Sequence, residues 1–67
     1  MSGYDEIALA AFGREAMNEI CKIYDDRKGN YLTVDQNAIQ RVFDRFPNAT
    51  DEAKLRVHAW AAFMTRQ

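Results

Sequence analysis

The chain has 67 residues, 48% of them hydrophobic, and a formal net charge of −1. This length predicts one small domain, residues 1–67, and the balanced charge argues against indiscriminate binding to phosphate backbones. Cys21 is the only cysteine, so no disulfide can stabilise the domain, and the lack of a leader pattern or a long apolar run favours a cytoplasmic protein without a membrane span.

The first predicted helix covers residues 3–27. Ser2 followed by Asp5 resembles a capping box, in which the two side chains satisfy the first free N–H groups of a helix. At 100° per residue the apolar positions occupy about half of the helix surface, wider than the usual stripe of about 100°. We therefore expect this helix to be the spine, the central helix that contacts both others. Its apolar arc comprises Leu9, Phe12, Ala16, Met17, Ile20, Ile23 and Tyr24.

Gly13 lies within that apolar arc. A glycine inside a helix costs up to ~1 kcal/mol relative to alanine. Two interpretations follow from the sequence: another backbone approaches closely at this point, or the glycine is a tolerated defect that produces a mild kink.

Residues 24–37, YDDRKGNYLTVDQN, raise the question of a calcium-binding loop. An EF-hand loop needs oxygen ligands at alternate positions and a glutamate at its twelfth. A loop that starts at Asp25 places Arg27 at the third position, and one that starts at Asp26 places Lys28 there. No register supplies the final glutamate, so the segment is predicted to be a turn between helices.

Two capping signals define this turn. Gly29 is expected to adopt the left-handed conformation that ends the first helix near Lys28. Thr33 and Gln36 form a T-x-x-Q capping box that begins a second helix over residues 33–46, which Pro47 ends. The apolar residues of this helix are Ala38, Ile39, Val42, Phe43 and Phe46.

The third predicted helix covers residues 50–66 and begins at Asn48 or Thr50. Its first turn is acidic, which suits the positive pole of the helix dipole, and Glu52 is placed to pair with Arg56. With the other two segments it predicts an all-α fold, a compact three-helix bundle with helices at about 3–27, 33–46 and 50–66. The main apolar face of the third helix is predicted to be Ala53, Val57, Trp60, Ala61 and Met64.

A second apolar strip runs along the third helix, off its main face. We predict that this strip, together with Tyr31, binds a partner protein, because one small bundle cannot shelter so much apolar surface. Trp60 and Met64 fit either the core or the interface, since aromatic residues and methionine are common in both. The strip consists of Leu55, Ala59, Ala62 and Phe63.

Catalytic chemistry is not expected. Cys21 is interpreted as a buried or half-buried structural residue, and His58 as a solvated residue beside Lys54. Glu15 and Glu19 lie one turn apart on a hydrated, charged face. The single histidine argues against a metal site, and three scattered glycines do not form a phosphate-binding loop. We therefore expect no metal and no cofactor.

Two functions remain open. The first is a small helical interaction module that regulates or inhibits a larger protein by covering one of its surfaces, as a single chain or as a homodimer. A chain that starts at Met1 and ends after one minimal domain is typical of such regulators, including phage-encoded inhibitors. The alternative is a helix-turn-helix-like transcriptional regulator, although Asp51 and Glu52 would repel phosphates at the start of its recognition helix.

Overall fold

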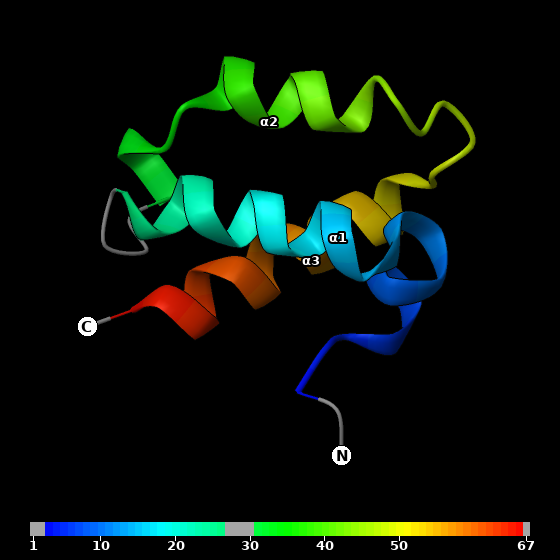
Figure 1. The fold of residues 1–67 in the computed structure, drawn as a ribbon, viewed down its shortest axis with the longest axis horizontal. Coiled ribbons are helices and arrows are strands. Elements are labelled where there is room, and N and C mark those ends of the chain that lie inside the picture. Colours follow the sequence, from blue (N-terminus) through cyan, green and yellow to red (C-terminus); the bar gives the residue numbers. More distant parts are fainter. Residues whose placement is uncertain (1–2, 27–30, 67) are drawn as a thin grey trace.

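The structure is a computed structural model that describes residues 3–26 and 31–66. These residues form α1 (Glu6–Asp25), the short 3-10 helix η1 (Tyr31–Thr33), α2 (Gln36–Phe43) and α3 (Asp51–Thr65), with no strand among them. The longest helix, α1, packs against α2 and, more extensively, against α3 (Figure 1). The predicted all-α, three-helix bundle with its first helix as the spine is confirmed.

Asp5 is the N-cap of α1. Its backbone is extended, with φ −68° and ψ 123°, and its Oδ1 accepts a hydrogen bond from the N–H of Ala8 at 3.0 Å. The prediction that the helix begins at residue 3, with Asp5 three residues after an N-cap, is therefore wrong. Gly3 has a φ of +78°, outside the range of a right-handed helix, and aspartate is itself one of the strongest N-caps. Ser2 lies outside the described residues.

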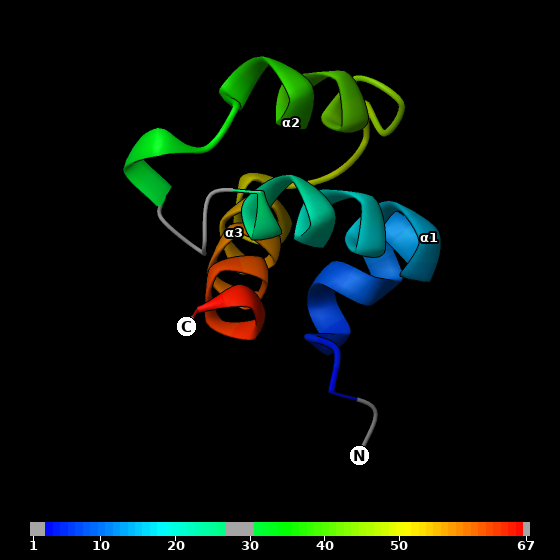
Figure 2. The ribbon, with the colours of Figure 1, turned by 60° about the vertical axis from the view of Figure 1, so that its left-hand side comes forward.

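Gly13 divides α1 into two segments. Its φ of +82° and ψ of 161° fall in a region that is essentially restricted to glycine, and the helix changes direction there (Figure 2). A Cβ built at this position would meet no atom within 4 Å, so the prediction of a close backbone approach is wrong. The kink interpretation is confirmed, and the break is sharper than the mild bend expected. The last helical residue is Asp25, earlier than predicted, and the proposed cap at Gly29 lies outside the described residues.

The second helix begins three residues later than the sequence predicts. Thr33 ends η1, and Asp35 is the N-cap of α2, with its Oδ1 accepting from the N–H of Ala38 at 3.1 Å. The capping box between Thr33 and Gln36 is therefore wrong, because the extended residue that precedes the helix is Asp35. The helix also ends early, at Phe43, and gives way to a tighter turn in which the N–H of Phe46 donates to the carbonyl of Phe43 at 2.8 Å.

The predicted start of the third helix is confirmed at Thr50. The Thr50 Oγ1 accepts from the N–H of Ala53 at 3.1 Å, and the helix ends one residue before its predicted end, with Arg66 as the C-cap. None of the described helices combines the length and the apolar content that crossing a bilayer requires.

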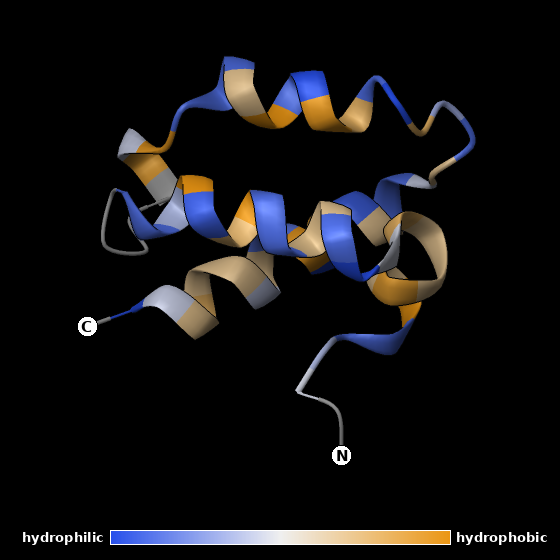
Figure 3. Cartoon of the chain, viewed as in Figure 1, coloured by the Kyte–Doolittle hydropathy of each residue, from blue (hydrophilic) through white to orange (hydrophobic). Residues whose placement is uncertain are grey.

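The core lies where the apolar faces of the helices meet, and the apolar positions of α2 lie on its side toward α1 (Figure 3). The ring of Phe12 joins the helices in the core, since it stacks on Phe43 at a centroid distance of 5.4 Å and meets Phe46 edge-on at 5.4 Å. The buried apolar residues are Ala8, Phe12, Ala16, Met17, Ile20 and Tyr24 from α1, Val34, Ile39, Val42 and Phe43 from the second part of the chain, and Ala53, Val57 and Ala61 from α3.

His58 is half-buried and contacts core residues, so its interpretation as a solvated residue is wrong. Its Nδ1 lies 2.6 Å from the phenol oxygen of Tyr24, and its ring meets the ring of Phe43 edge-on at 5.5 Å. Burial lowers the pKa of the imidazole. These ring contacts come from α1 and α2, which lie far from His58 in the sequence, so the local periodicity of α3 does not reveal them.

Candidate protein-interaction surface

The inner side of α3 fixes the orientation of the whole helix. Ala53, Val57, Ala61 and Thr65 recur every four residues, and all four are buried against the rest of the bundle. The hydroxyl of Thr65 donates to the carbonyl of Ala61 at 2.7 Å, which satisfies the one buried polar side chain of this line. Because these residues face inward, positions two residues removed from them must point outward.

The outward positions carry large apolar side chains. Leu55 is 69% exposed and Phe63 is 73% exposed, and Ala59 between them is also exposed. We call Leu55, Ala59 and Phe63 the outer α3 face. Contiguous apolar surface of this kind marks interaction sites in small proteins, whereas single exposed apolar residues are ordinary. Of the four residues of the predicted second apolar strip, these three lie on the surface. The fourth, Ala62, is half-buried and packs against the core.

Met64 extends this surface. It is 51% exposed, so of the two places that the sequence left open for it, core or interface, the structure excludes the core. At 100° per residue Met64 falls between the buried Ala53 and Val57, so its exposure reflects its place in the last turn of α3, where the described elements do not fully cover this side of the helix. Met64 instead lies beside Phe63 at the edge of the outer α3 face.

A groove adjoins the outer α3 face where the N-terminal segment crosses α3. One of its lining residues is Trp60, whose ring stacks on Tyr4 at a centroid distance of 5.3 Å and whose indole N–H donates to the carbonyl of Gly3 at 2.7 Å. Trp60 is therefore half-buried, between the core and the surface. The groove has a volume of about 510 Å³ and is lined by Gly3, Tyr4, Asp5, Arg56, Ala59, Trp60, Phe63 and Met64.

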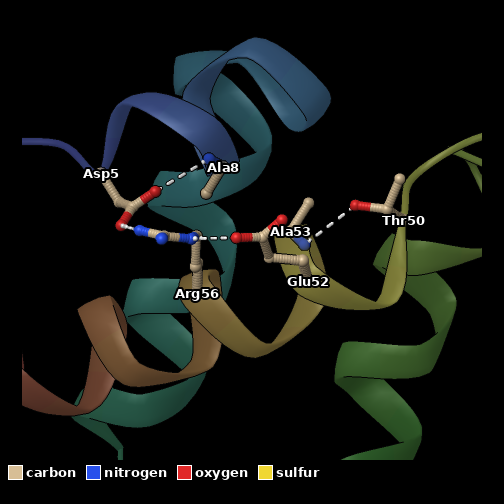
Figure 4. A network of polar contacts seen from close by, with 6 residues as sticks. All are labelled: Asp5, Ala8, Thr50, Glu52, Ala53 and Arg56. Carbon is tan, nitrogen blue, oxygen red and sulfur yellow. Dashed lines mark hydrogen bonds and ion pairs between the residues drawn. The ribbon is translucent and has the colours of Figure 1, made fainter.

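Charged side chains hold the N-terminal segment against α3 (Figure 4). The guanidinium of Arg56 donates through Nη1 to Asp5 and through Nε to Glu52, each at 3.2 Å. The hydrogen bond from the N–H of Ala8, aided by Arg56, lowers the pKa of Asp5, and the bonds to Asp5 and Glu52 raise the pKa of Arg56. The arrangement gives the groove a charged rim and a fixed shape.

Leu32 and Ile7 are also exposed apolar residues, and both lie outside the outer α3 face. Leu32, in η1, is 89% exposed, and sequence analysis missed it because a single leucine before a helix has no periodic partner. The predicted contact residue Tyr31 begins η1, and its side chain lies outside what the structure describes. A second groove of about 560 Å³ lies beside the turn that contains Phe46 and Pro47, with the partly exposed Ile7 on its other wall.

Cysteine and carboxylate side chains, which can act as nucleophiles or metal ligands, lie at several places in the structure. Cys21 is half-buried, as predicted, and burial with the nearby Asp25 carboxylate raises the pKa of its thiol, so little reactive thiolate forms. The predicted charged face holds for Glu19, which forms an ion pair with Arg45 at the surface, and this hydrogen bond lowers the pKa of the Glu19 carboxyl. Within residues 3–26 and 31–66, no three of the histidine, cysteine and carboxylate side chains gather as a metal site would require.

No protein-family model, curated protein or solved structure matches this chain. The roles of its residues therefore follow from their geometry and chemistry.

Proposed function

We propose that the protein is a small, non-catalytic interaction module that docks the outer α3 face onto a larger protein and thereby regulates or inhibits that partner. The observation that supports this most directly is the exposure of Leu55 and Phe63 on the same side of one helix. Full burial of a leucine or phenylalanine side chain contributes about 1.5–3 kcal/mol, so covering the two is a substantial source of affinity.

The surface is also preorganised for docking. The opposite side of α3 is buried, its N-terminus is capped by Thr50, and Arg56 ties its outer side to the N-terminal segment. A partner therefore meets a helix whose backbone is already ordered, and binding loses less conformational entropy than the ordering of a flexible segment would. The mechanism is steric: the helix covers a functional surface of the partner and performs no chemistry.

Capture from a host lysate, followed by mass spectrometry, tests this function with two matched variants. Phe63→Glu places a charge at the largest apolar side chain of the outer α3 face and is expected to abolish capture. Asn37→Glu adds the same charge to the exposed side of α2 and is expected to capture as the wild type does. Equal capture by Phe63→Glu and the wild type would show that another surface is used.

The nucleic-acid alternative receives less support from the same geometry. Arg45 is paired with Glu19, and Arg56 is paired with Asp5 and Glu52, so two of the cations that it would use are engaged by carboxylates. Phosphate contacts depend on cations that are available to displace counterions.

A further inference from the structure

Five residues on the outer side of α3 are spaced symmetrically along the helix. At 3.6 residues per turn, five positions fall within an arc of about 80°, and the intervals between them are three, four, four and three residues. The central position is Ala59, and positions at equal distances on either side carry chemically complementary side chains. The five residues are Glu52, Leu55, Ala59, Phe63 and Arg66.

From this arrangement we infer that a second copy of this chain covers the outer α3 face, with the two α3 helices antiparallel about a two-fold axis at Ala59. The inference rests on the proposed function, because it takes the outer α3 face to be a docking surface: the second copy covers this face until a larger protein replaces it. In such a pair, each residue lies opposite the one equally far on the other side of Ala59. Leu55 of one copy then packs beside Phe63 of the other, twice by symmetry.

Charge selects this orientation. The side chain of Glu52 is 63% exposed, and Arg66 is exposed at the opposite end of the helix. An antiparallel pair places Glu52 opposite Arg66 of the second copy at both ends. A parallel pair would place Glu52 beside Glu52 and Arg66 beside Arg66, and like charges that face each other across an interface oppose association.

Ala59 suits the crossing point. Helix axes in contact lie 8–10 Å apart depending on the side chains between them, and two alanines allow the close end of this range. The large residues then flank the axis and bury their rings and methyl groups against each other. A single helix pair is small for a protein interface, so the dimer is expected to dissociate on dilution.

Sedimentation equilibrium over a dilution series tests the orientation through charge exchange. Glu52→Arg and Arg66→Glu each create two repulsive pairs, and each is expected to raise the dimer dissociation constant by about tenfold. An equimolar mixture of the two variants restores opposite charges and is expected to associate as tightly as the wild type. Circular dichroism checks that each variant keeps its helices, since Glu52 also pairs with Arg56 within the chain.

Cross-linking tests the axis. In a Cys21→Ala background, Ala59→Cys is expected to form a disulfide-linked dimer on mild oxidation, because the two residues face each other at the axis. Gln40→Cys, exposed on α2, is the control and is expected to remain unlinked. A chain that is monomeric at every concentration, a mixture that does not restore association, or equal cross-linking of both variants would overturn the inference. A monomer that still captures a different protein through Phe63 would also overturn it and would leave the proposed function standing.

Discussion

Tyr24 and His58, 34 residues apart, are joined by a 2.6 Å hydrogen bond between the phenol oxygen and Nδ1. This bond connects the C-terminal half of α1 to the middle of α3. The phenol is buried and the imidazole half-buried, so each supplies the polar contact that the other needs away from water.

Acidification is expected to destabilise the fold through His58. Burial lowers the imidazole pKa in the folded protein, whereas the unfolded chain has a pKa of about 6.5. Between these values the unfolded state binds more protons, so the free energy of unfolding falls as the pH is lowered from 7 and levels off below the folded pKa. Urea unfolding at a series of pH values measures this slope.

The matched variant is His58→Asn, which keeps a polar group at the δ position and does not titrate. It is expected to be less stable than the wild type at pH 7 and to lose the pH dependence between pH 7 and 5. The same slope in both proteins would assign the effect to another group.

Gly13→Ala is expected to destabilise the protein by about 1–3 kcal/mol, although alanine has the higher helix propensity. The reason is the φ of +82° at Gly13, which an L side chain rarely adopts, and not a lack of space. Thermal unfolding followed by circular dichroism measures the change. Chemical synthesis with D-alanine at this position is the control: its preferred dihedrals are the mirror image, so the loss should be smaller. A more stable Gly13→Ala variant would mean that α1 runs straight through residue 13.

Replacements of Asp5 separate its capping role from its charge. Asp5→Ala removes the acceptor for the N–H of Ala8 and is expected to cost about 1 kcal/mol, whereas Asp5→Asn keeps a strong cap and loses only the pairing with Arg56. Chemical denaturation at pH 7 should therefore rank the stability of the wild type first, Asp5→Asn second and Asp5→Ala last. Equal losses in the two variants would assign the whole effect to the ion pair.

Protonation of Asp5 is expected to lower the stability of the fold at a lower pH than protonation of His58 does. The folded pKa of Asp5 is below its usual value, so its contribution is present above about pH 4 and is lost as the pH falls through the folded pKa. Comparison of the wild type with Asp5→Asn below pH 4 should show their stabilities converging. A difference that persists at low pH would contradict this assignment.

Phe63→Ala is expected to change the free energy of unfolding by less than about 0.5 kcal/mol, because the side chain lies on the surface. Ile20→Ala, at a fully buried position of α1, should cost about 2–5 kcal/mol by leaving a cavity. Denaturant midpoints of the two variants measure the contrast. A large loss at Phe63 would place that ring in the core and remove the basis of the outer α3 face.

Local pattern in the sequence determined the helical class, the core face of each helix and the start of α3 at Thr50. It also identified Leu55 and Phe63 as apolar residues off the core face, because the direction of a side chain within a regular helix depends only on its position in the repeat. The capping residues were harder to assign, since Ser2 and Asp5, or Thr33 and Asp35, compete for the same role a few residues apart.

Tertiary structure decided what local pattern leaves open. The break at Gly13 makes α1 two segments, so a single helical phase does not apply along its whole length. His58 is held by Tyr24 from a distant part of the chain, and Met64 is exposed although its helical phase matches that of the buried Ala53 and Val57. Each outcome depends on which helix packs against which. The 3.6-residue repeat determines on which side of a helix a side chain lies. Whether that side is buried depends on the other elements that pack against the helix.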